Sequence, residues 1–181
     1  MDLGLRGKRA LVVGSSYGMG NGIARTLAAE GANIILTARS GDILKKEAAD
    51  IRDQFGVRVE SIACDLSKEN EIDQVINFAL DRFNGIDIQF NNCGGPPRLL
   101  PSEADDILWR EWFDLIMISA IRMTNGTLPG MRERGWGDEA IRAFKDFKED
   151  VDTKPISAPI SQADFVPVTD KLLRATVKKF K

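Results

Sequence analysis

Three glycines near the N-terminus have a spacing suited to binding a phosphate group. Gly14, Gly18 and Gly20 separate an apolar run at 8–14, typical of a buried strand, from a helical apolar pattern that begins at Met19. Glycines let the backbone approach a pyrophosphate closely and adopt positive φ at little cost. The following helix would offer unpaired N–H groups and the positive end of its dipole. The turn therefore predicts dinucleotide binding, and an ordinary tight strand-to-helix turn is the alternative.

The residue after the second predicted strand indicates which dinucleotide would be preferred. An apolar run at 32–38 ends in Ala38, and Arg39 follows, nineteen positions after Gly20. Sites that prefer NAD usually place an acid there to hold the ribose hydroxyls. A guanidinium suits a 2′-phosphate instead, so we expect NADP(H) to be favoured over NAD(H). An ordinary surface arginine is the alternative.

Strands and helices alternate through the first half of the chain. Apolar runs predict strands over 8–14, 32–38, 57–63 and 86–90. Helical patterns fill the intervals, with Ser67 expected to cap the third helix and glycines expected to end all three, namely Gly31, Gly56 and Gly85. Alternation with short connections predicts an α/β fold, a doubly wound Rossmann-type parallel sheet with a 3-2-1-4 core.

The second half of the chain begins with a long predicted helix, at about 104–134. Pro129 is expected to kink or end it, and one side carries Trp112, Leu115, Ile116, Ser119 and Met123. From 138 onward the sequence predicts a charged helix, a proline-punctuated connection, an edge strand at 165–168 and a basic terminal helix. We assign 1–137 to the dinucleotide-binding domain. We interpret 138–181 as a remnant of the substrate side of the same domain, which is truncated after the fourth strand and the long helix.

Composition narrows the possible functions. The chain has 181 residues, of which 43% are apolar, and a net charge of −2, which suits one soluble domain without attraction to nucleic acid or anionic membranes. No apolar run has the length of a membrane span, and two cysteines indicate a cytoplasmic protein without a disulfide scaffold. There is no histidine, which excludes Ser-His and Cys-His mechanisms, and we predict no metal site.

Three motifs together resemble the short-chain dehydrogenase/reductase family over about residues 3 to 137. They are the glycine turn, CDL at 64–66 and NNCG at 91–94. The resemblance implies that Asp65 contacts adenine and that 91–94 stabilise the sheet and border the cofactor. The segments GGPP and LPGMRERGWG are similar to a branch of acyl-carrier-protein reductases and sugar dehydrogenases. The expected cofactor-binding residues are Gly14, Ser16, Tyr17, Gly18, Met19, Gly20, Arg39, Asp65, Leu66, Asn91, Cys93 and Gly94.

The catalytic residues of that family have no counterpart in this sequence. The family uses a Ser on a fifth strand and a Tyr-x-x-x-Lys on the next helix, but this chain reads Asp138–Glu139 where that strand would begin. The one tyrosine, Tyr17, lies in the glycine turn and is followed four positions later by Asn21. Ile116 takes the place of the family's helical active-site Asn. We therefore assign no catalytic residue, since Ser102, Ser119 and Cys93 have no visible base beside them.

These observations leave three functional hypotheses. The first is an NADP(H)-dependent oxidoreductase acting on a carbonyl or alcohol, with catalytic groups supplied by a partner chain or by sequence that this chain lacks. The second is a non-catalytic nucleotide-binding protein that assembles with itself or with an intact relative. The third is a degenerate product without activity. An uncovered strand edge and apolar helix face predict a homo-oligomer.

Overall fold

The computed structural model describes residues 3–95 and 105–135. They belong to the first of two compact units, Met1–Asp138. The elements predicted within 138–181 lie outside the described residues.

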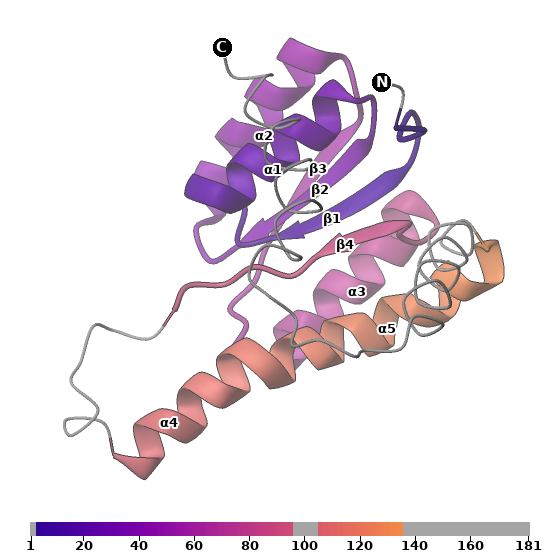
Figure 1. Ribbon diagram of the computed structural model, residues 1–181. Coiled ribbons are helices and arrows are strands. Elements are labelled where there is room, and N and C mark those ends of the chain that lie inside the picture. The colour runs from indigo at the N-terminus through magenta and orange to yellow at the C-terminus, as the bar shows by residue number, and fades with distance from the viewer. Residues whose placement is uncertain (1–2, 96–104, 136–181) are drawn as a thin grey trace, which may run out of the picture. The chain divides into compact units, whose positions relative to one another are not determined.

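A four-stranded parallel sheet forms the centre of the described unit (Figure 1). Its strands are β1 (Arg9–Val13), β2 (Asn33–Ala38), β3 (Val59–Ala63) and β4 (Ile88–Phe90), in the order β3-β2-β1-β4. In register, Leu11 of β1 lies beside Ile35 of β2 and Gln89 of β4. The doubly wound arrangement and the 3-2-1-4 order predicted from the sequence are confirmed.

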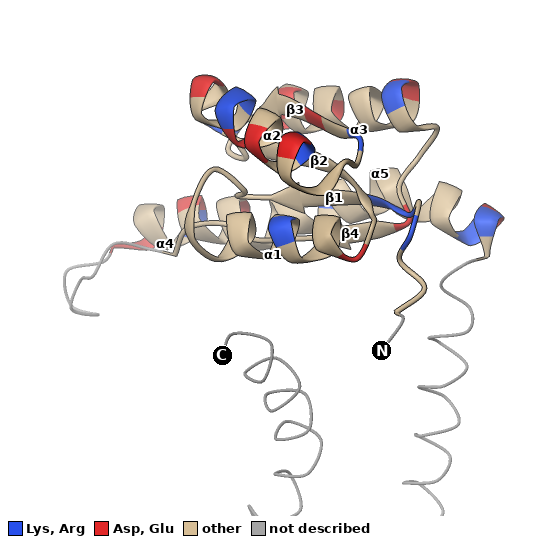
Figure 2. Cartoon of the chain, turned by 90° about the horizontal axis from the view of Figure 1, so that it is seen from above, with Lys and Arg blue, Asp and Glu red and all other residues tan. Residues whose placement is uncertain are grey.

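Helices cover both faces of the sheet. Successive β1 residues point to opposite sides, so alternate residues of this strand contribute to two separate cores. On one face, Ala10 and Val12 join a core with α1 (Gly18–Ala29) and α2 (Gly41–Phe55). On the other face, Leu11 and Val13 pack with α3 (Glu69–Phe83) and with Met123 of the long helical segment. Figure 2 shows acidic and basic residues interspersed along the helices, with the strands largely uncharged.

The ends of the first three helices follow the predictions in part. Gly31 has φ +87° just after α1, and Gly56 is the left-handed cap of α2. At the end of α3, Asn84 takes the left-handed cap conformation and Gly85 follows it with φ +99°. The prediction that Ser67 caps α3 is wrong. Its hydroxyl donates to Asp65 at 2.8 Å, and α3 begins after Lys68 without a side-chain cap.

The long helix predicted at about 104–134 has three parts. α4 (Asp106–Phe113) is followed by a π-helical turn (Asp114–Ile118) and then by α5 (Ser119–Arg134). Asp105 caps α4, because its side chain accepts a hydrogen bond from the Leu108 N–H at 2.8 Å. The π-helical turn was not predicted, since no proline or glycine marks it in the sequence.

Pro129 lies inside α5 and does not end it. A proline removes one helical hydrogen bond, but tertiary contacts hold the last turn of this helix in place. The Arg134 guanidinium donates to Asp87 at 3.1 Å and also to the Ile86 carbonyl. Of the predicted apolar side, Ser119 and Met123 are buried, while Trp112, Leu115 and Ile116 are half-buried. Among the described residues, no helix combines the length and apolar character that a membrane span requires.

Candidate dinucleotide-binding site

The glycine turn connects β1 to α1 and has the backbone geometry that its sequence predicts. Gly14 and Gly18 have φ of +66° and +63°. α1 starts at Gly18 after the extended residue Tyr17, with no side-chain cap and no acidic residue in its first turn. Its N-terminal N–H groups and positive dipole end therefore have no competing carboxylate from the helix itself, which suits an anionic ligand.

Two of the glycines are required by close packing within the turn. A Cβ on Gly20 would collide with the Gly14 carbonyl oxygen, and one on Gly14 would lie 2.6 Å from Asn92. A Cβ on Gly18 would meet nothing within 4 Å, so the backbone there is open to an approaching ligand. The turn thus combines a tightly packed base with an accessible outer residue.

Hydrogen bonds fix the turn against its neighbours. The Thr37 N–H donates to the Ser15 hydroxyl oxygen at 2.9 Å, and the Ser15 N–H donates to the Thr37 carbonyl at 3.2 Å. The Asn92 amide nitrogen donates to the Gly14 carbonyl at 3.3 Å. Ser15 was not among the predicted site residues, because its role depends on a partner 22 positions away. The turn is therefore held in place from both β2 and the segment after β4.

The other predicted residues of the turn differ in exposure. Ser16 is half-buried, whereas the side chains of Tyr17 and Met19 are 74% and 73% exposed. These two large side chains leave apolar surface exposed beside the glycine turn at the start of α1.

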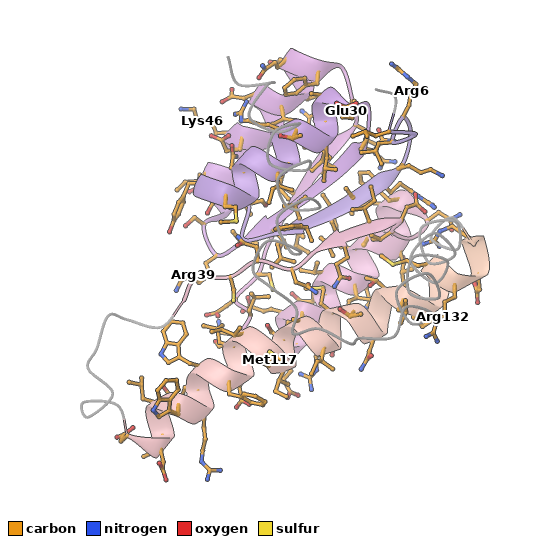
Figure 3. The ribbon with its side chains drawn as sticks, in the orientation of Figure 1. Arg6, Glu30, Arg39, Lys46, Met117 and Arg132 are labelled. Carbon is orange, nitrogen blue, oxygen red and sulfur yellow. The ribbon has the colours of Figure 1, made fainter. Side chains whose placement is uncertain are left out.

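Arg39 follows β2 directly and is exposed (Figure 3). Within the part of the chain that the structure describes, its guanidinium forms no ion pair. Hydrogen bonds from Ser67 are the main cause of the lowered carboxyl pKa of Asp65, and the charge of Arg39 adds a small contribution in the same direction. An exposed guanidinium at the carboxyl end of the sheet is available for an anionic group of a ligand.

Asp65 lies after β3 in a fixed position. Its carboxylate accepts hydrogen bonds from the Ser67 N–H at 3.0 Å and the Ser67 hydroxyl at 2.8 Å, and these bonds hold its pKa below the usual value. The Asp65 N–H donates to the Glu71 carboxylate at 2.7 Å. Asp65 is consequently ionised at neutral pH, with its orientation set before any ligand binds.

A hollow of about 180 Å³ lies where the segments after β3 and β4 face the long helix. Among the predicted residues, Leu66, Asn91 and Cys93 line it. Sequence reasoning did not assign its remaining walls to the site, and they are formed by Val13, Asn92, Ile116, Ser119, Ala120 and Met123. The helical spacing of Ile116, Ser119 and Met123 indicated one helix side, but not what that side would face. Gly94 is exposed just beyond the hollow.

Among the described residues, the two thiols and the Ser119 hydroxyl lack the environment of an activated nucleophile. Burial raises the pKa of the Cys93 thiol, and burial together with Glu71 and Asp65 raises that of Cys64 to about 11. The Ser119 hydroxyl donates to the Leu115 carbonyl at 2.5 Å. Ser102 lies outside the described residues. Among the described residues, no group of three or more His, Cys, Asp or Glu side chains could hold a metal ion.

Comparison with known proteins decides the family. The short chain dehydrogenase family matches residues 8–138. The chain belongs to this family. The predicted resemblance is confirmed.

Three similar proteins illustrate the match. D-beta-hydroxybutyrate dehydrogenase of Cupriavidus necator is 38% identical over 134 residues, which are 74% of this chain and 51% of that protein. A 3-oxoacyl-acyl-carrier-protein reductase of Aquifex aeolicus is 31% identical over 137 residues, 76% of this chain and 55% of the reductase. The structure of L-sorbose reductase from Gluconobacter frateurii, complexed with NADPH and L-sorbose, is 40% identical with a TM-score of 0.72. It covers 75% of this chain and 51% of the reductase. This chain therefore spans about half the length of the relatives that it matches.

Proposed function

We propose that the described unit binds NADP(H), as the dinucleotide-binding part of an oxidoreductase that acts on a carbonyl or alcohol. The observation that carries this proposal is the open, uncapped start of α1 at Gly18, with Arg39 exposed at the end of β2. The first feature suits a pyrophosphate and the second a 2′-phosphate. The NADPH complex of L-sorbose reductase supports the choice of cofactor.

Within this site, we propose that the glycine turn contacts the phosphates and Tyr17 and Met19 cover them. Asp65 and Leu66 would contact the adenine, and Asn91, Cys93 and Gly94 would border the cofactor. When bound, the dinucleotide would supply or accept the hydride. The described residues contribute binding and orientation to that chemistry, because they offer no tyrosine or lysine placed to transfer the hydroxyl proton.

A second candidate function is nucleotide binding without catalysis in an assembly of several chains. The exposed apolar side of α4 and the turn after it favours this candidate. Its exposed side chains include Trp109, Phe113 and Met117, with exposed fractions from 48% to 56%. α4 extends past the sheet in Figure 1 and contacts mainly the π-helical turn that follows it. Exposed aromatic surface of this kind favours association, so we propose a homo-oligomer that uses this side of α4.

One experiment separates the two candidates. The purified chain is first weighed by intact mass spectrometry against its 20.0 kDa. NADPH oxidation is then followed at 340 nm with 3-oxoacyl thioesters, ketoses and simple ketones. Oxidation that depends on one of these substrates supports the oxidoreductase. Saturable NADPH binding with no oxidation of any of them supports the non-catalytic protein.

A further inference from the structure

A polar cluster connects β4 to α5 on the face of the sheet that is otherwise apolar. Gln89 lies in register beside the fully buried Leu11 and therefore on the side covered by α3 and α5. Its amide nitrogen donates to the Thr124 hydroxyl oxygen at 3.0 Å, and the Thr127 hydroxyl donates to its amide oxygen at 2.5 Å. These contacts satisfy an amide that would otherwise be costly at this position.

The same cluster holds the side chain of Asn91 by both ends of its amide. The Gln89 amide nitrogen donates to the Asn91 oxygen at 2.9 Å, and the Asn91 nitrogen donates to the Thr124 hydroxyl oxygen at 3.3 Å. Asn91 lines the 180 Å³ hollow together with Leu66. The Asn91 amide, which forms part of one wall of that hollow, is therefore oriented by Gln89 and Thr124. Neither of these two residues lines the hollow.

We propose that Gln89 and Thr124 are positioning residues of the dinucleotide site. They hold the Asn91 amide in the orientation that borders the adenosine half of the cofactor, and so they set its affinity. This inference rests on the proposed function. Thr127 differs from Thr124, because it contacts the amide oxygen of Gln89 and, among the described residues, has no hydrogen bond to Asn91.

Three threonine variants of the full chain test the inference. Thr124→Val removes the hydroxyl at nearly constant volume, Thr124→Ser keeps it, and Thr127→Val removes the neighbouring hydroxyl one turn away. We expect Thr124→Val to raise the Kd for NADPH about five- to tenfold, since the variant loses the hydroxyl oxygen that accepts from both the Asn91 and the Gln89 amides. Thr124→Ser and Thr127→Val should stay within about twofold of the wild type.

Two further measurements, of 2′,5′-ADP binding and of stability, make the result decisive. The Kd for 2′,5′-ADP, which lacks the nicotinamide half, should rise by the same factor as that for NADPH in Thr124→Val. Urea unfolding shows whether each variant is folded, and we expect Thr127→Val, whose hydroxyl is the more deeply buried, to lose stability without losing affinity.

The outcomes separate this inference from the proposed function. If Thr124→Val binds NADPH as the wild type does, or if both valine variants lose affinity in proportion to stability, the cluster is only structural and the inference is overturned. If the wild type itself fails to bind NADPH, the proposed function fails and the inference fails with it.

Discussion

The proposed cofactor preference depends on one residue at the carboxyl end of β2, Arg39, whose side chain is exposed. Binding of a 2′-phosphate to a guanidinium would add charge-assisted hydrogen bonds that NADH cannot form. The rest of the site, including the glycine turn and Asp65, would contact groups that the two cofactors share. Preference and binding can therefore be changed separately.

Replacing Arg39 should remove the preference while leaving dinucleotide binding in place. We expect Arg39→Ala to raise the Kd for NADPH about 10- to 100-fold, corresponding to about 1.5–3 kcal/mol for charged hydrogen bonds, with little change for NADH. Titration of both cofactors measures this. Arg132→Ala, which removes an exposed arginine near the end of α5, is the matched control (Figure 3). Equal weakening for NADPH and NADH would contradict the assignment.

Two glycines only two positions apart should respond in opposite ways to alanine. Gly20→Ala places a Cβ against the Gly14 carbonyl, so the turn must shift. We expect a loss of about 1–3 kcal/mol in the free energy of unfolding, together with weaker NADPH binding. The Cβ added by Gly22→Ala meets nothing within 4 Å, and the residue lies inside α1. We therefore expect this variant to raise the free energy of unfolding by about 0.5–1 kcal/mol. Urea denaturation checks both, and a stable Gly20→Ala protein would contradict the close packing.

At the scale of the elements, one carboxylate joins β1, β4 and α5. Asp87 accepts from the Arg9 guanidinium at 2.6 Å and from Arg134 at 3.1 Å. Burial alone would raise the Asp87 pKa, but the hydrogen bonds from the two arginines outweigh it and hold the pKa below its usual value. The long helical segment, whose earlier residues line the site, is anchored to the sheet through this group.

Stability should therefore depend on the ionisation of Asp87. A carboxyl with a lowered folded-state pKa stabilises the protein fully above its unfolded value of about 4, and this contribution is lost as the pH falls below it. We expect Asp87→Asn to lower the free energy of unfolding at pH 7 by about 2–4 kcal/mol, because two part-buried arginines lose their partner. Unfolding by urea between pH 3 and pH 7 should show that acidification lowers the free energy of unfolding less in the variant than in the wild type. Identical pH profiles would contradict this role.

The sequence predicted those elements whose signals are local. Apolar runs located all four strands, and the glycine spacing located the turn at Gly14–Gly20, because buried strands and positive φ leave direct marks on composition. The continuation of α5 past Pro129 could not be predicted, since it depends on Arg134 reaching Asp87 across 47 positions. The cluster around Gln89 was missed for the same reason, because its partners lie 35 and 38 positions away.

At the scale of the whole molecule, the apolar side of α4 should control association. We expect sedimentation velocity to show an oligomer for the wild type and a smaller species for Trp109→Glu combined with Phe113→Glu, since a buried charge opposes contact between apolar surfaces. Lys46→Glu, on the exposed part of α2, is a control for added negative charge (Figure 3). A wild-type protein that sediments as a compact monomer would contradict the proposed assembly.

The cofactor site is the part of the molecule on which every functional proposal depends. The measurement that tests it most directly is a titration of the wild-type chain with NADPH and, in parallel, with NADH. Nicotinamide fluorescence and energy transfer from the three tryptophans would report binding. Saturable binding that favours NADPH is the predicted result. Failure to bind either dinucleotide, or tighter binding of NADH, would contradict the roles proposed for the glycine turn and for Arg39.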